Sequence, residues 1–289
     1  MLGKRSLFRS SQGYTTLMAA YQAQLARWTV PVDSRVVPTR YGHTHLLAAG
    51  AEGSPPLLLI HGLSACALVW RPNIPTLSQT FRVYALDVIG DVGKSAPTRP
   101  PLRGSAYADW LVDVLDALSI ERANVIGLSL GGWMTLKLAI HAPDRVIRIM
   151  PLCPPGLTPY RMEFVQTALR ATLFRTRETI GSLARSLSPS TGLAPEDAEM
   201  LHLTIRYHRS KRVPLRLFSD EELGRISAPT TLLVGEHEAI FNPVMMVERA
   251  RQTIPSIRAD VIANAGHALN CDQPAVLHER ARQFFGAAV

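Results

Sequence analysis

A serine flanked by glycines is the residue in this sequence whose setting best suits chemistry. Ser129 lies in Gly-Leu-Ser-Leu-Gly (127–131), between an apolar run at 124–126 that is typical of a strand and a helical pattern that begins at 133. Small residues two positions before and after the serine let the chain turn sharply from strand to helix. The hydroxyl then lies at the N-terminal end of a helix, where backbone N–H groups can stabilise an oxyanion. The spacing predicts a serine nucleophile; the alternative is a glycine-rich turn that only caps a helix.

A serine hydroxyl is a weak nucleophile at neutral pH unless a neighbouring base accepts its proton. His267 follows the last predicted strand (257–262) and precedes the last predicted helix, so its loop should reach the same edge of the sheet as the serine. His43 and His45 share a strand face, but no third ligand follows at the spacing of a metal site. We therefore predict that His267 is the general base, and we expect no metal.

An acidic side chain should orient that imidazole from a loop between the serine and the histidine. The loop after the apolar run 146–150 holds no carboxylate, whereas Gly-Glu-His-Glu-Ala-Ile (235–240) holds two. Position along the chain leaves both Glu236 and Glu238 as candidates.

Eight short runs favour strands, and helix-length segments separate most of them: 35–39, 44–48, 57–60, 81–86, 124–126, 146–150, 231–234 and 257–262. This alternation is typical of an α/β fold with a mostly parallel sheet and helices on both faces. The first two runs predict an antiparallel pair at its edge. Between 156 and 225 the strand pattern gives way to a helical one. We predict an N-terminal helical segment (1–34), a core (35–155 and 226–289) and an inserted helical lid (156–225).

The formal charge of +8 is confined to two segments. Residues 1–40 hold six basic and one acidic side chain, residues 156–225 hold eleven and eight, and the rest of the chain is balanced. The basic residues are not interleaved with aromatic ones on one surface, so we expect no nucleic-acid partner. A preference for anionic substrates or surfaces stays open.

The sequence also indicates a compartment. No apolar run approaches the roughly 20 residues of a membrane helix. The basic residues at 4, 5 and 9 precede polar residues rather than the apolar stretch of an export signal. Three scattered cysteines suit reduced thiols rather than a disulfide framework, so we expect a cytoplasmic protein without a membrane span.

Together these motifs resemble those of the α/β-hydrolase superfamily. The resemblance rests on His61-Gly62, the loop 87–95, the turn 127–132, the loop 235–238 and Gly266-His267, and it extends from about residue 35 to the C-terminus. It is closest to a bacterial carboxylesterase branch. That branch similarly shows Asp-x-Ile-Gly-Asp-x-Gly-x-Ser, a Gly-Leu-Ser-Leu-Gly-Gly-Trp turn and a glutamate in the acid loop.

The resemblance implies an α/β-hydrolase fold with an eight-stranded, mostly parallel sheet, an inserted lid, and a triad of serine, histidine and an acid. The acid loop of related hydrolases reads Gly-x-x-Asp, which matches Glu238 and leaves Glu236 as the alternative. The fold implies backbone N–H donors to an oxyanion from Leu63 and Leu130. Supporting roles in shaping and pinning these loops are expected for His61, Gly62, Gly127, Gly131 and Asp87.

The activity implied is hydrolysis of small-molecule carboxylic esters through an acyl-enzyme, without a cofactor. We expect a monomer or homodimer. The same triad also serves lactone hydrolysis, C–C bond hydrolysis, perhydrolysis and acyl transfer, because a fold does not fix a reaction. A catalytically silent binding protein is a further alternative. Apolar residues of the lid are candidates either for an acyl pocket or for packing the lid on the core: Met162, Phe164, Leu169, Leu173 and Phe174.

Overall fold

The computed structural model describes residues 7–210 and 215–286. Its centre is one eight-stranded sheet in the order β1-β2-β4-β3-β5-β6-β7-β8. Strand β2 runs antiparallel to both of its neighbours, and the other pairs are parallel. The strands are β1 (Asp33–Thr39), β2 (Gly42–Ala49), β3 (Pro56–Ile60), β4 (Arg82–Leu86), β5 (Ala123–Leu128), β6 (Val146–Leu152), β7 (Thr230–Gly235) and β8 (Ile257–Ile262). The predicted α/β-hydrolase fold is confirmed, including the antiparallel edge.

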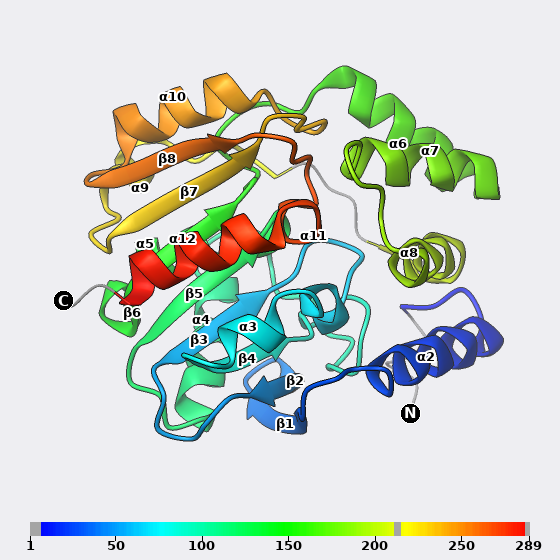
Figure 1. Cartoon of the computed structure of the whole chain (residues 1–289), viewed down its shortest axis with the longest axis horizontal. Helices are drawn as coiled ribbons and strands as arrows, with labels where there is room; N and C mark the ends of the chain where they lie inside the picture. Colours follow the sequence, from blue (N-terminus) through cyan, green and yellow to red (C-terminus); the bar gives the residue numbers. More distant parts are fainter. Residues whose placement is uncertain (1–6, 211–214, 287–289) are drawn as a thin grey trace.

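Helices cover both faces of this sheet (Figure 1). The cause is visible in β3, where Leu58 and Ile60 join one buried cluster while Leu57 and Leu59 join the other. Successive side chains of a strand point to opposite faces, so a strand that is apolar throughout needs a cover on each side. One cover is formed by α4 (Ala106–Ala117), α5 (Leu130–His141), α9 (Asp220–Gly224) and α10 (Pro243–Thr253); the other includes α3 (Ile74–Leu77), α11 (Leu269–Asp272) and α12 (Pro274–Gly286).

Three longer helices lie between β6 and β7, at one end of the sheet (Figure 1). They are α6 (Met162–Phe174), α7 (Arg177–Leu187) and α8 (Pro195–Tyr207). They share a small buried cluster of their own around Ala171, Ile180 and Leu183. The short helix α9, which follows them, packs instead against α5 and α10.

The N-terminal segment holds α8 in place. Helix α2 (Ser11–Leu25) packs against α8, and the Gln24 side-chain amide donates to the Glu196 carbonyl over 2.6 Å. Before α2, Phe8 and His208 form an antiparallel bridge. Parts of the predicted N-terminal segment, lid and core, namely 1–6, 211–214 and 287–289, lie outside the described residues. Within the described chain no helix is long and apolar enough to span a membrane.

Candidate active site

Ser129 occupies the turn from β5 to α5, at φ 52° and ψ −116°. Such a conformation is costly for a residue with a side chain, so the surroundings must hold it. The Ser129 N–H donates to the Leu152 carbonyl over 2.8 Å, and its carbonyl accepts from Trp133 N–H at 2.9 Å. A Cβ atom on Gly131 would lie 2.1 Å from the Ile60 carbonyl oxygen, so the start of α5 packs on β3 more closely than any side chain allows.

His267 and Glu238 form a buried pair. The imidazole Nδ1 lies 2.7 Å from Glu238 Oε2, and the two residues are 6% and 1% exposed. The second carboxylate oxygen, Oε1, accepts the Ile240 N–H over 2.6 Å. Because Glu238 is an acceptor on Nδ1, the neutral imidazole carries its proton there and leaves Nε2 free to accept another.

The environment keeps Glu238 ionised. Burial raises the pKa of this carboxyl, but attraction to His267 and hydrogen bonds from His267, the Cys153 thiol and Ile240 N–H outweigh burial and lower it overall. Burial also raises the pKa of the Cys153 thiol well above its usual range, which keeps the sulfur protonated as a donor. The contact of Cys153 with Glu238 was not predicted, because only a carboxylate was sought in the loop after β6.

Glu236 lies elsewhere. Its carboxylate accepts the Asn264 N–H over 3.1 Å and its side chain is 51% exposed. The backbone explains the difference, since the N–H groups of Glu236 and His237 donate to the Ile262 and Ala265 carbonyls. These bonds fix the loop so that Glu238, not Glu236, is directed at the imidazole.

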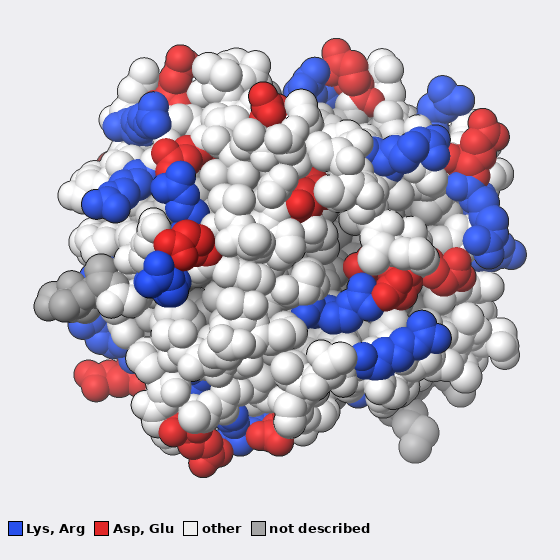
Figure 2. Space-filling view, in the orientation of Figure 1, with Lys and Arg blue, Asp and Glu red and all other residues white. Residues whose placement is uncertain are grey.

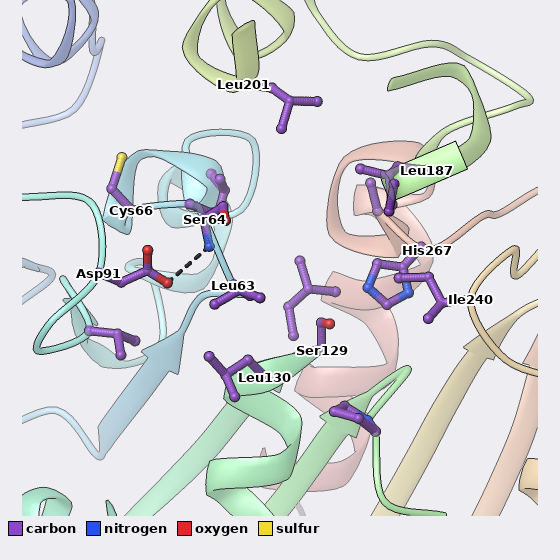
Figure 3. Close-up of a pocket in the computed structure, with 18 of the residues that line it drawn as sticks. Leu63, Ser64, Cys66, Asp91, Ser129, Leu130, Leu187, Leu201, Ile240 and His267 are labelled. Atoms are coloured by element: carbon purple, nitrogen blue, oxygen red, sulfur yellow. Dashed lines mark hydrogen bonds between the residues drawn. The ribbon is translucent and has the colours of Figure 1, made fainter. Parts of the chain in front are cut away.

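Ser129 and His267 line the same cavity, and Figure 3 shows them facing each other from β5 and the β8–α11 loop. No hydrogen bond joins the hydroxyl to the imidazole among the described residues. Such contacts are often loose without substrate and tighten when it binds. The structure therefore brings the predicted nucleophile and base to one site.

The two residues predicted to supply oxyanion donors lie at the same cavity. Leu63 and Leu130 line the cavity beside Ser129 (Figure 3), and neither N–H donates to an acceptor within the described chain. A Cβ on Gly62 would lie 3.3 Å from that of Ser129, so the loop after β3 passes close to the serine. This position suits N–H groups that stabilise negative charge on a substrate oxygen.

His61 is fully buried and fixes this loop. Its Nε2 accepts the Val88 N–H over 2.9 Å, so Nδ1 carries the proton and donates to the Gly62 carbonyl over 2.7 Å. The loop is also held from the β4 side, where Asp91 accepts the Ser64 N–H over 2.9 Å (Figure 3). These contacts hold the loop after β3 beside the loop after β4.

Asp87 is a buried junction rather than part of the cavity wall. Its carboxylate accepts from His45 Nδ1 at 2.8 Å, from the Ala67 and Lys94 N–H groups at 2.9 Å each, and from the Tyr21 hydroxyl at 3.2 Å. Burial raises its pKa, but the hydrogen bond and charge of His45 and the two backbone N–H bonds outweigh burial and lower the pKa overall. Asp87 thereby joins α2, β2 and the loops after β3 and β4.

The loop that carries His267 is tied to the end of α7. Ala268 N–H donates to the Leu187 carbonyl over 2.9 Å. Asp272 accepts the Gly266 N–H over 2.6 Å and also the Ser188 hydroxyl. The inserted helices therefore contact the residues on either side of the histidine directly.

The cavity has a volume of about 640 Å³ and a mainly apolar wall. The N-terminal helix, the β3 and β4 loops and the inserted helices all contribute to it. One acidic group in the wall has an altered pKa. Burial raises the pKa of Asp197 to about 6, although Arg71 lies 3.7 Å away.

The predicted lid residues divide into two groups. Phe164 and Leu169 line the cavity, whereas Met162, Leu173 and Phe174 do not and are largely exposed. The sequence suggested that Met162, Leu173 and Phe174 form an acyl pocket or pack the lid on the core. In the structure these three side chains do neither.

One group of possible metal ligands overlaps the site. Cys153, Glu238 and His267 offer ligand atoms within 4.8 Å of one another. An ion there would have to replace the 2.7 Å bond between the imidazole and the carboxylate. The contact between His267 and Glu238 is the one expected of a general base and the acid that orients it.

Comparison with known proteins agrees with this geometry. Residues 55–184 match the family model described as the alpha/beta hydrolase fold. A Bacillus subtilis protein named uncharacterized carboxylesterase nap is 37% identical over 92% of this chain and 91% of its own length. The crystal structure of naproxen esterase from Bacillus subtilis has a TM-score of 0.87 at 34% identity and covers 96% of this chain and 99% of that one. Carboxylesterase CesB (YbfK) of the same organism has a TM-score of 0.89 at 30% identity, covering 96% and 100%.

Proposed function

Because this chain belongs to the α/β-hydrolase superfamily and its near-full-length relatives are carboxylesterases, we propose that it hydrolyses carboxylic esters with Ser129, His267 and Glu238. The observation that carries the proposal is the buried 2.7 Å contact between His267 Nδ1 and Glu238, in a cavity that Ser129 also lines. That contact leaves Nε2 as the proton acceptor on the side of the serine.

In the first half of the reaction, Ser129 Oγ attacks the ester carbonyl carbon and His267 Nε2 takes the hydroxyl proton. The N–H groups of Leu63 and Leu130 donate to the oxyanion that forms. The carbon–oxygen bond to the alcohol then breaks, and the imidazolium returns its proton to the leaving alkoxide. Glu238 stabilises the imidazolium throughout, which its lowered pKa supports.

In the second half, water attacks the acyl carbon while His267 Nε2 takes one of its protons. The bond from that carbon to Ser129 Oγ then breaks, the imidazolium returns the proton to Oγ, and the acid product leaves. The apolar wall of the cavity suits an uncharged, bulky acyl or alcohol group. We assign the inserted helices α6–α8 as a lid, because they close this cavity over the sheet edge.

The test is turnover of p-nitrophenyl butyrate combined with labelling by a fluorophosphonate. Wild type should be labelled at Ser129, and Ser129→Ala should abolish both labelling and turnover. His267→Ala should lower kcat by about 10⁴ or more. Unchanged turnover in either variant contradicts the assignment. A panel of lactones and amides then separates ester hydrolysis from the other reactions of this triad.

We further propose a cytoplasmic location. All three cysteines are free thiols, and Cys66 and Cys153 are buried. Reduced thiols are the usual state in that compartment. We also propose that the protein acts as a monomer or homodimer on small molecules, without a nucleic-acid partner.

A further inference from the structure

Helix α6 exposes an apolar stripe to solvent. In a chain of this size, large apolar side chains are normally exposed singly rather than in a row. Here four of them follow one another along one side of a single helix, with exposed fractions of 64% (Met162), 40% (Val165), 54% (Leu169) and 63% (Leu173).

The stripe is separate from the buried side of the same helix. Phe164, Ala168 and Ala171 pack inward against the neighbouring helices. Met162, Val165, Leu169 and Leu173 recur at intervals of three and four, which places them together along another side of the helix. Helix α6 therefore has two apolar sides, and only one of them has a partner within the described chain.

The stripe is continuous with the candidate active site. Val165 and Leu169 line the cavity and are also exposed at its rim, so the apolar wall extends onto the outer surface of α6. Helices α6 and α7 form the outermost part of the molecule at this end (Figure 1). An apolar molecule that leaves a surface in contact with the stripe would enter the cavity without crossing a polar barrier.

The charges around the stripe favour an anionic occupant. Residues 161–187 hold five arginines and two glutamates. Within the described chain neither Arg170 nor Arg185 forms an ion pair. On the face shown in Figure 2, charged side chains of both signs surround uncharged surface at this end of the molecule. A second copy docked about a two-fold axis would bring this positive segment against itself, which is unfavourable.

We propose that the stripe on α6 docks on the surface of an anionic phospholipid bilayer, so that the cavity takes apolar esters from that surface. Apolar side chains of the stripe insert at the boundary of headgroups and acyl chains, and the arginines contact lipid phosphates. The docking step does not depend on Ser129, although the delivery of substrate rests on the proposed esterase function.

The experiment is co-sedimentation with vesicles of phosphatidylcholine containing about one third phosphatidylglycerol, at low and at physiological salt. Wild type and Ser129→Ala should bind equally, which separates docking from catalysis. Met162→Ser combined with Leu173→Ser should weaken binding by at least about tenfold, because two large side chains of the stripe no longer insert. Both residues lie outside the cavity wall, so turnover of dissolved p-nitrophenyl butyrate should be unchanged.

Val36→Ser is the matched control. Val36 is 61% exposed on β1, at the sheet edge away from α6 (Figure 1), and its replacement should leave vesicle binding intact. Arg170→Gln combined with Arg185→Gln should reduce binding to anionic vesicles severalfold and leave binding to phosphatidylcholine alone unchanged.

Three results would overturn the proposal. Wild type could fail to bind the anionic vesicles, or the Met162→Ser, Leu173→Ser variant could bind as wild type does. In the third, wild type is a dimer by light scattering and that variant is a monomer, which would show that a second copy covers the stripe.

Discussion

Replacing Glu238 with glutamine tests how the imidazole is held. The substitution keeps the size of the side chain but removes its charge, and an amide nitrogen directed at His267 Nδ1 would favour the wrong tautomer. In the transition state the imidazolium and the carboxylate are full charges whose centres lie about 4 Å apart, inside a site where both residues are buried. At an effective dielectric constant of about 20 their attraction is about 4 kcal/mol, which corresponds to about 10³-fold in kcat.

The assay is steady-state hydrolysis of p-nitrophenyl butyrate, with thermal unfolding to show that each variant is folded. Glu238→Gln should lower kcat by about three orders of magnitude and change KM little, since the lost interaction forms during the reaction. Glu236→Gln is the control, because that carboxylate is half exposed and contacts the Asn264 N–H and the half-exposed His237 rather than His267. Its kcat should stay within about twofold of wild type. If Glu236→Gln is the damaging change and Glu238→Gln is not, the acid is wrongly assigned.

Two further predictions concern stability. Gly131→Ala should lower the free energy of unfolding, measured in urea, by about 3 kcal/mol, because its Cβ would collide with the Ile60 carbonyl oxygen. Gly181→Ala within α7 is the control and should be neutral or stabilising by up to about 1 kcal/mol. Equal effects of the two changes would contradict the close approach of α5 to β3. The Asp197 carboxyl has its pKa raised from 3.8 to about 6 on folding, so the folded state binds the extra proton and loses stability as pH rises through that interval. Asp197→Asn should therefore be more stable than wild type at pH 7, by up to about 2–3 kcal/mol, and no more stable below pH 4; a constant difference in urea midpoints across this range would refute the cause.

Local patterns were enough to predict the sheet. The run predicted at 257–262 coincides with β8, and the other seven strands lie within a few residues of their predicted positions. Asparagine followed by proline is a local pattern that favours a helix start, and the Asn242 side chain accepts the Met245 N–H at the start of α10. Strands and helix starts depend on neighbours in the sequence, which is why these predictions succeeded.

Features that depend on distant parts of the chain could not be predicted in the same way. Choosing between Glu236 and Glu238 requires the direction of a loop, and that direction is set by bonds to the β8 end and its following turn. The thiol of Cys153 meets Glu238 only because β6 and β7 are neighbours in the sheet. The apolar residues of α6 could be read from the sequence, but the residues that cover them could not. The sequence therefore did not predict which side of α6 stays exposed.

The bonds between the end of α7 and the histidine loop limit how such an enzyme can diversify. An inserted segment is usually the easiest part of a fold to exchange for another. Here Leu187 and Ser188 belong to the insertion, yet their contacts with Ala268 and Asp272 steady the residues on either side of the base. A chimera with a foreign inserted segment would change substrate choice and disturb proton transfer together. It would avoid this only if its junction keeps the carbonyl that Leu187 offers and the hydroxyl that Ser188 offers.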